Sequence, residues 1–249
     1  MLKSVLPLMF AAALAVTGCG SSNTNQDAVP DLAPDKLYQV AKASMASGDF
    51  TKALRYLNAL DTRYPFGELT DQLQLDMIYC YYKSRESAMT TAAINRYLRL
   101  NPTGQYNDYV LYMKGLNEIQ MHSSLIQDFM GLNRSQKDPT TYYEAIKTFR
   151  QLIQEYPDSP YVKDARQRMI YIREQLAERE FKIAKYYFDR EAYLSSVRHC
   201  QSILYSFRDT QYLQPALELM SKGYRKLGLE LPASNTDRVI NDTYYHAKN

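Results

Sequence analysis

The sequence predicts an all-α protein, and more specifically an α-solenoid of repeated helix pairs. An apolar pattern with helical period runs from residue 50 to residue 64 and ends at Pro65. The same pattern recurs 92 residues later and ends at Pro157 (157 − 65 = 92). Glycine is scarce, with 9 among 249 residues, and charged helix formers are common. Similarity at a fixed spacing is typical of stacked repeats that share a continuous core.

The first copy of the pattern shows how each helix should begin and end. Gly48 is expected to break the preceding helix, Asp49 to cap the next one, and Pro65 to end it. Weaker copies begin at Ile94 and at Tyr193. A helical bundle in which the Tyr-Pro endings recur by chance is the alternative interpretation.

The spacing of small residues resembles that of the tetratricopeptide repeat (TPR). Ala41, Ala53 and Pro65 follow one another at intervals of 12 residues. The resemblance implies about five TPR-like helix pairs over residues 35–231. In the third pair the corresponding small residues are Gly115 and Ala145, which are 30 apart, so we expect an insert at 123–140.

The remaining helices are predicted from apolar periodicity and from breakers. Asp158-Ser159-Pro160 is expected to begin a helix, and no breaker follows until Asp189-Arg190, which predicts one unusually long helix that bridges two repeats. Pro232 is expected to begin a degenerate last helix within a tail at 232–249. The other expected helices span 34–47, 50–63, 70–83, a segment ending at 101, 108–122, 192–207 and 213–227.

The first 18 residues are predicted to be a signal peptide. Lys3 precedes an apolar run over residues 5–16, which is too short for a membrane span of about 20 residues. Residues 16–19, Val-Thr-Gly-Cys, resemble a bacterial lipobox, which implies covalent diacylglycerol and an N-acyl chain on Cys19. Residues 19–34 would then form a flexible tether. A plain secretory signal with an incidental cysteine is the alternative.

Neither catalytic nor nucleic-acid-binding chemistry is predicted. The three histidines lack partners at metal-ligand spacing, and no nucleophile or phosphate-loop motif occurs. A net charge of +3 is too small for a nucleic-acid-binding surface. We expect a non-enzymatic protein with no metal and no noncovalent cofactor, in which Cys80 and Cys200 are buried free thiols. An enzyme is the less favoured class.

The TPR resemblance implies a peptide-binding groove lined by the first helix of each pair. Tyrosines beside lysines suit an extended peptide that carries aromatic side chains and a free carboxylate. The alternative is that several of these tyrosines pack between helices. The groove positions carried over are Tyr38, Lys42, Leu75, Tyr79, Tyr82, Lys83, Tyr109, Tyr112 and Leu116.

Several longer motifs resemble the BamD/ComL family, the TPR lipoproteins of the outer-membrane β-barrel assembly machinery. They include Ala-Leu-Asp-Thr-Arg-Tyr-Pro-Phe-Gly at 59–67, Gln-Leu-Asp-Met-Ile-Tyr at 74–79 and Tyr-Val-Leu-Tyr-Met-Lys-Gly-Leu at 109–116. Over residues 19–230 this resemblance implies a scaffold anchored by lipid to the periplasmic face of the outer membrane. It also implies three kinds of partner: the periplasmic domains of the barrel subunit BamA, the other Bam lipoproteins and unfolded β-barrel substrates. A TPR pilotin-type or cell-wall-associated lipoprotein is the alternative.

Arg198 is the residue we expect to anchor the barrel subunit. The repeat frame places Val197, Cys200 and Ile203 on the buried face, and Arg198 lies about 100° further round the helix. The family resemblance places the interface with the barrel subunit in this region. An exposed guanidinium there would pair with a partner carboxylate through two parallel hydrogen bonds. An ordinary solvated arginine is the alternative.

Overall fold

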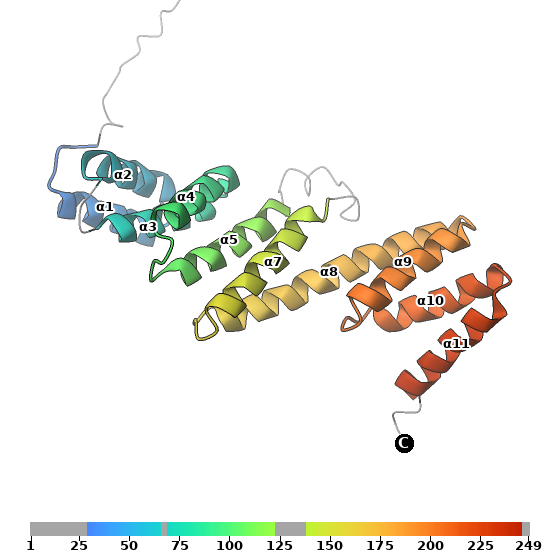
Figure 1. Ribbon diagram of the computed structural model, residues 1–249. Coiled ribbons are helices and arrows are strands. Elements are labelled where there is room, and N and C mark those ends of the chain that lie inside the picture. The colour runs from blue at the N-terminus through green and yellow to red at the C-terminus, as the bar shows by residue number, and fades with distance from the viewer. Residues whose placement is uncertain (1–28, 66–68, 123–137, 246–249) are drawn as a thin grey trace, which may run out of the picture.

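The computed structural model describes residues 29–65, 69–122 and 138–245, and these residues form an elongated array of α-helices without a β-strand (Figure 1). The predicted all-α fold is confirmed. The predicted signal peptide, Cys19, most of the tether and most of the 123–140 insert lie outside the described residues.

The helices form the five pairs expected of a TPR-like solenoid: α1 with α2, α3 with α4, α5 with α7, α8 with α9, and α10 with α11. Their bounds are α1 Pro34–Ala46, α2 Phe50–Arg63, α3 Thr70–Lys83, α4 Ser87–Leu100, α5 Asn107–His122, α7 Thr140–Glu155, α8 Val162–Asp189, α9 Tyr193–Ser206, α10 Leu213–Lys226 and α11 Glu230–Ile240. A short π-helical turn, Asn241–Tyr245, follows α11.

The long bridging helix is present as α8, whose 28 residues serve two repeats. It packs against α7 of the third repeat and against α9 of the fourth. One helix therefore joins the amino-terminal and carboxy-terminal halves of the solenoid without a turn between them (Figure 1).

The last helix differs from the expectation, because α11 begins at Glu230 rather than at Pro232. Proline is tolerated in the first turn of a helix, where its missing N–H has no intrahelical partner in any case. Ala233, Thr236 and Ile240 are buried, and α11 packs on α10. The expected boundary between residues 231 and 232 therefore falls inside the fifth helix pair.

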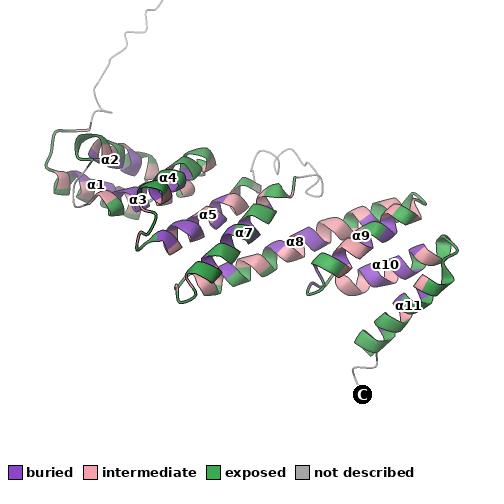
Figure 2. Ribbon diagram, in the orientation of Figure 1, coloured by how far each residue is buried: buried purple, intermediate pink, exposed green. Residues whose placement is uncertain are grey.

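Buried residues recur along every α-helix that the structure describes (Figure 2). Their apolar side chains form two clusters. The smaller cluster joins α1, α2 and one side of α3, where Met77 and Cys80 lie. The larger cluster begins on the other side of α3, at Leu75 and Ile78, and continues to Ile240 in α11. Helix α3 is therefore the element that both clusters share.

The turn within each pair uses the same backbone conformation in four repeats. Gly48 and Gly228 have φ values of +80° and +71°. Arg85 and Glu191 occupy the equivalent positions with φ values of 60° and 61°. Gly48 and Arg85 are 37 residues apart (85 − 48), and so are Glu191 and Gly228 (228 − 191). Asp49 caps α2 as predicted, since its carboxylate accepts a hydrogen bond from the backbone N–H of Lys52 at 2.9 Å.

The predicted small position in the third repeat is confirmed at Gly115. A Cβ atom at this position would lie 2.4 Å from the ring of Phe149 on α7, so only glycine lets the two helices approach this closely. The two cysteines of the described residues, Cys80 and Cys200, are buried and free as expected. Burial raises the pKa of each thiol to about 12, so both remain protonated at neutral pH.

Candidate functional site

Seven of the nine predicted groove residues lie at least partly exposed on the first helices of the first three repeats, α1, α3 and α5. We call the surface that they form the A-helix face. All seven are half-buried or exposed: Tyr38, Lys42, Tyr79, Tyr82, Lys83, Tyr109 and Tyr112. Two other predicted positions, Leu75 and Leu116, are buried in the larger cluster, which corrects the expectation that they line a groove.

The first part of the A-helix face is organised around the buried carboxylate of Asp76 on α3. The Tyr38 hydroxyl donates to it at 2.7 Å, the Gln72 amide at 3.1 Å, and the Lys42 ammonium lies 3.4 Å away. Burial and the hydrogen bond to Asp76 raise the pKa of Tyr38, which stays a neutral donor. Asp76 therefore ties α1 to α3 while its carboxylate remains paired.

Further along α3, Tyr79 and Lys83 pack around Phe50 of the preceding pair. The ring centroids of Phe50 and Tyr79 are 6.0 Å apart in an edge-on arrangement, and the Lys83 ammonium lies 5.9 Å from the Phe50 ring. Tyr82 is partly buried against the larger cluster. These aromatic groups keep part of their surface on the outside of the solenoid.

The third part of the face joins α5 to the start of α8. Tyr112 stacks on Tyr161 with ring centroids 4.8 Å apart, and its hydroxyl donates to Asp164 at 2.6 Å. Tyr109 lies beside the same Tyr161 ring, with centroids 5.6 Å apart. Burial of the Asp164 carboxyl opposes its ionisation, but hydrogen bonds from Tyr112 and Arg168 outweigh this and lower its pKa.

The structure therefore supports the packing interpretation for several tyrosines without burying them completely. Four side chains of this face that the sequence analysis missed are Asp76, Tyr161, Asp164 and Arg168. Asp76 carried a usable signal, because it stands among apolar residues at 73, 75, 77 and 78 on one helix. Asp164 and Arg168 carried none, since their contact with Tyr112 spans more than 50 residues of sequence.

The predicted anchor, Arg198, lies on α9 and is exposed, while Val197, Cys200 and Ile203 are buried as predicted. The guanidinium of Arg198 makes no hydrogen bond or ion pair with the part of the chain that the structure describes. Leu194 and Tyr205 stand on the same stripe of the helix and are 54% and 72% exposed. The stripe combines an arginine with two exposed apolar side chains, a composition common at the centres of protein interfaces.

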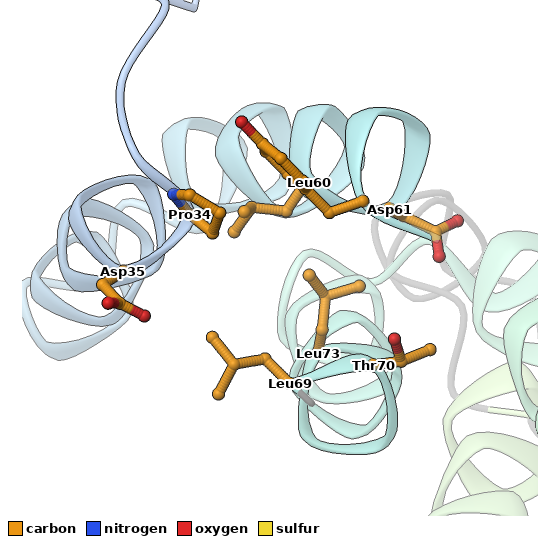
Figure 3. Close-up of a pocket in the computed structure, with 8 residues that line it drawn as sticks. Pro34, Asp35, Leu60, Asp61, Leu69, Thr70 and Leu73 are labelled. Atoms are coloured by element: carbon orange, nitrogen blue, oxygen red, sulfur yellow. The ribbon is translucent and has the colours of Figure 1, made fainter. Parts of the chain in front are cut away.

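A separate pocket of about 260 Å³ lies at the amino-terminal end, between α1, α2 and α3 (Figure 3). Apolar side chains line most of it, and Asp35 and Asp61 add carboxylates. Asp61 is paired with Arg96 of α4, whose Nη1 lies 2.6 Å from the carboxylate. None of the predicted groove residues lines this pocket.

Neither metal-ligating clusters nor membrane-spanning helices were found in the described ranges. Over 29–65, 69–122 and 138–245, no group of histidine, cysteine and carboxylate side chains could hold a metal ion. The helices in these ranges are also too short or too polar to cross a bilayer.

The five helix pairs and the A-helix face define a TPR-like helical-repeat protein. Residues 30–239 match the YfiO family, described as outer membrane lipoproteins, and the chain belongs to this family.

Relatives of this chain carry the name outer membrane protein assembly factor BamD. The Vibrio cholerae protein is 39% identical over 223 residues, which cover 90% of this chain and 91% of the relative. The Pasteurella multocida protein is 34% identical, covering 92% and 86% of the two chains. A Neisseria meningitidis protein is 32% identical, covering 98% and 92%.

Proposed function

We propose that this protein is an outer-membrane lipoprotein scaffold of the β-barrel assembly machinery. The observation that carries the proposal is similarity to BamD proteins over nearly the whole of both chains, with 39% identity to the Vibrio cholerae protein. The fold suits this role, because a solenoid offers an extended surface on which several partners bind at once. In this proposal the protein has no catalytic chemistry of its own.

Attachment to the membrane would come from lipid on Cys19. Stable anchoring requires more than one acyl chain, at about 0.8 kcal/mol for each buried CH₂ group. Diacylglycerol together with an N-acyl chain on Cys19 meets this requirement. The support is the match to a family of outer membrane lipoproteins together with the lipobox-like residues 16–19.

The two ends of the solenoid would hold different partners. The A-helix face would bind extended segments of unfolded β-barrel proteins, because its half-buried tyrosines offer aromatic surface and Lys42 and Lys83 offer positive charge. The exposed stripe around Arg198 would hold the periplasmic domains of BamA. The other Bam lipoproteins would complete the complex.

Purification from detergent-solubilised outer membrane tests this function. Wild-type protein is expected in the outer-membrane fraction and to co-purify with BamA and other Bam lipoproteins. Cys19→Ser should leave unprocessed or soluble protein, whereas Cys200→Ser serves as a control that removes a buried thiol. Co-purification with a pilus or cell-wall complex in place of BamA would favour a pilotin-type or cell-wall-associated lipoprotein. Normal processing and fractionation of Cys19→Ser would contradict the lipid attachment.

A further inference from the structure

The first described residues of the chain are held against the end of α2 by Arg63. Its Nη1 donates to the carbonyl oxygen of Pro30 and its Nη2 to that of Val29, each at 2.9 Å. The Asp31 carboxylate lies 4.0 Å from the same guanidinium. The planar guanidinium thus donates to two successive backbone carbonyls at once, a geometry that a lysine ammonium cannot reproduce.

Three further features make this contact a defined attachment point. Val29 packs against the apolar cluster of α1, α2 and α3. The Pro30 carbonyl also accepts from the backbone N–H of Leu32 at 3.1 Å, so both of its lone pairs are used. Pro30 and Pro34 restrict the backbone of the segment, which lowers the entropy lost when it is ordered.

We propose that Arg63 is a positioning residue that fixes the point at which the membrane tether leaves the solenoid. The consequence for the membrane rests on the proposed lipid on Cys19. From residue 19 to residue 29 the chain has ten Cα–Cα steps, which reach at most about 35 Å. We call the two hydrogen bonds from Arg63 to the carbonyls of Val29 and Pro30 the Arg63 clamp. Without this clamp the tether would extend to α1 at residue 34, and its reach would rise to about 50 Å.

The clamp also bears on the pocket at this end of the solenoid, because Pro34 forms part of its lining. Pro34 and Leu60 lie on one side of this pocket, and Leu69, Thr70 and Leu73 lie on the other (Figure 3). Arg63 thus sets the height of the amino-terminal repeat above the membrane, and the segment that it holds lies next to one wall of this pocket. The paired helices α1 and α2 become the membrane-proximal end of the molecule.

Hydrogen exchange tests the clamp directly and does not require the lipid. In Arg63→Gln and Arg63→Lys, the amide of Leu32, which donates to the Pro30 carbonyl, should exchange roughly tenfold faster or more, with the rest of the solenoid unchanged. Arg99→Gln is the matched control, because Arg99 is the exposed basic residue in the last turn of α4. Equal exchange of the Leu32 amide in wild type and both Arg63 variants would overturn the proposal.

Energy transfer to the membrane tests the consequence for the tether. Protein purified from membranes is labelled at Lys52→Cys, an exposed position on α2, and placed on vesicles containing acceptor lipids. Cys80 and Cys200 are buried and should escape labelling. Arg63→Gln should reduce the transfer, since the label then reaches further from the bilayer, and Arg99→Gln should not.

The outcomes separate the clamp from lipid attachment and from general stability. Faster exchange together with unchanged transfer would reject the role in positioning and leave Arg63 a stabilising residue only. A lower melting temperature with normal exchange of the Leu32 amide in the folded protein would also reject it. Failure of wild-type protein to bind vesicles would contradict the lipid on Cys19, and the exchange result would still decide whether Arg63 holds the tether.

Discussion

At the scale of single residues, buried or half-buried carboxylates connect helices of neighbouring repeats. Asp76 joins α1 to α3, and Asp164 joins α5 to α8. Each carboxylate accepts hydrogen bonds from a tyrosine or an arginine, which offsets the cost of removing the charge from water. These contacts fix how adjacent repeats are placed, because they lie between repeats and not within them.

Replacing Asp76 should show how much one such contact contributes. In Asp76→Ala the Tyr38 hydroxyl and the Gln72 amide lose their acceptor, so we expect the free energy of unfolding to fall by about 1–3 kcal/mol. Asp76→Asn keeps an acceptor oxygen and should cost less. Urea denaturation measures the change, with exposed Asp158→Ala as the control. An Asp76→Ala midpoint equal to that of the wild type would refute this role.

Asp209, an exposed residue in the turn after α9 that binds Arg173 of α8, should make the free energy of unfolding depend on pH. The hydrogen bond from Arg173 lowers the pKa of Asp209 in the folded protein, while the unfolded chain keeps a value of about 3.9. A carboxyl whose pKa is lower in the folded state stabilises the folded protein at pH values above its unfolded-state pKa. This stabilisation is lost as the pH falls through the folded-state pKa.

At pH 7 the urea midpoint of the wild type should therefore be higher than that of Asp209→Asn. The difference should close as the pH falls below about 3.9. Thermal and urea unfolding of both proteins between pH 7 and pH 2.5 would measure this. A difference that stays constant over the whole range would exclude the carboxylate as its origin.

At the scale of elements, the turns within pairs show how different side chains serve one backbone conformation. The left-handed position is glycine in the first and fifth repeats, but Arg85 and Glu191 in the second and fourth. The conformation is therefore imposed by the helix pair, and glycine only reduces its cost.

Adding a Cβ atom at Gly48 should measure that cost. Nothing lies within 4 Å of where the Cβ would be, so a loss of about 1 kcal/mol in Gly48→Ala would come from the backbone alone. Arg85→Ala at the equivalent position adds no Cβ and should leave the free energy of unfolding nearly unchanged. Equal effects of the two substitutions in urea denaturation would argue against this explanation.

Helix α9 presents Arg198, the residue that we expect to contact a partner protein. If the Arg198 guanidinium pairs with a carboxylate of BamA, Arg198→Glu should weaken association by about 2–5 kcal/mol, since like charges would then face each other. A pull-down of the BamA periplasmic domains at moderate salt measures it, with exposed Arg208→Glu as the control. Wild-type retention by folded Arg198→Glu would remove Arg198 as the anchor while leaving the docking of this end open.

At the scale of the whole molecule, the solenoid separates the A-helix face of the first three repeats from the Arg198 stripe of the fourth. The long helix α8 links the two halves, since it contributes Asp164 to the first surface and packs against α9, which carries the second. A rigid helix between two binding surfaces would keep a bound substrate segment and a bound partner at a constant separation.

The A-helix face yields the prediction about substrates. Tyr79→Ala combined with Tyr82→Ala should weaken binding of a peptide with an aromatic carboxy-terminal residue by about tenfold, since two aromatic contacts are lost. Titration calorimetry measures the affinity, and circular dichroism verifies that the helices persist. The control is Tyr171→Ala with Tyr186→Ala, a pair of exposed tyrosines on α8. Unchanged affinity in a folded Tyr79 and Tyr82 double variant would contradict the proposed site.

The sequence by itself determined the all-α class, the repeat frame and most helix ends, because helical period and the breakers Gly48 and Pro65 act locally along the chain. It also indicated Gly115 as the small position of the third repeat. Only the tertiary structure decided what the groove tyrosines do, because Tyr38 and Tyr112 meet carboxylates 38 and 52 residues away. The Arg63 clamp was likewise decided only by the tertiary structure, since its partners are backbone carbonyls more than 30 residues earlier. Contacts between residues so far apart leave no pattern of spacing in the sequence.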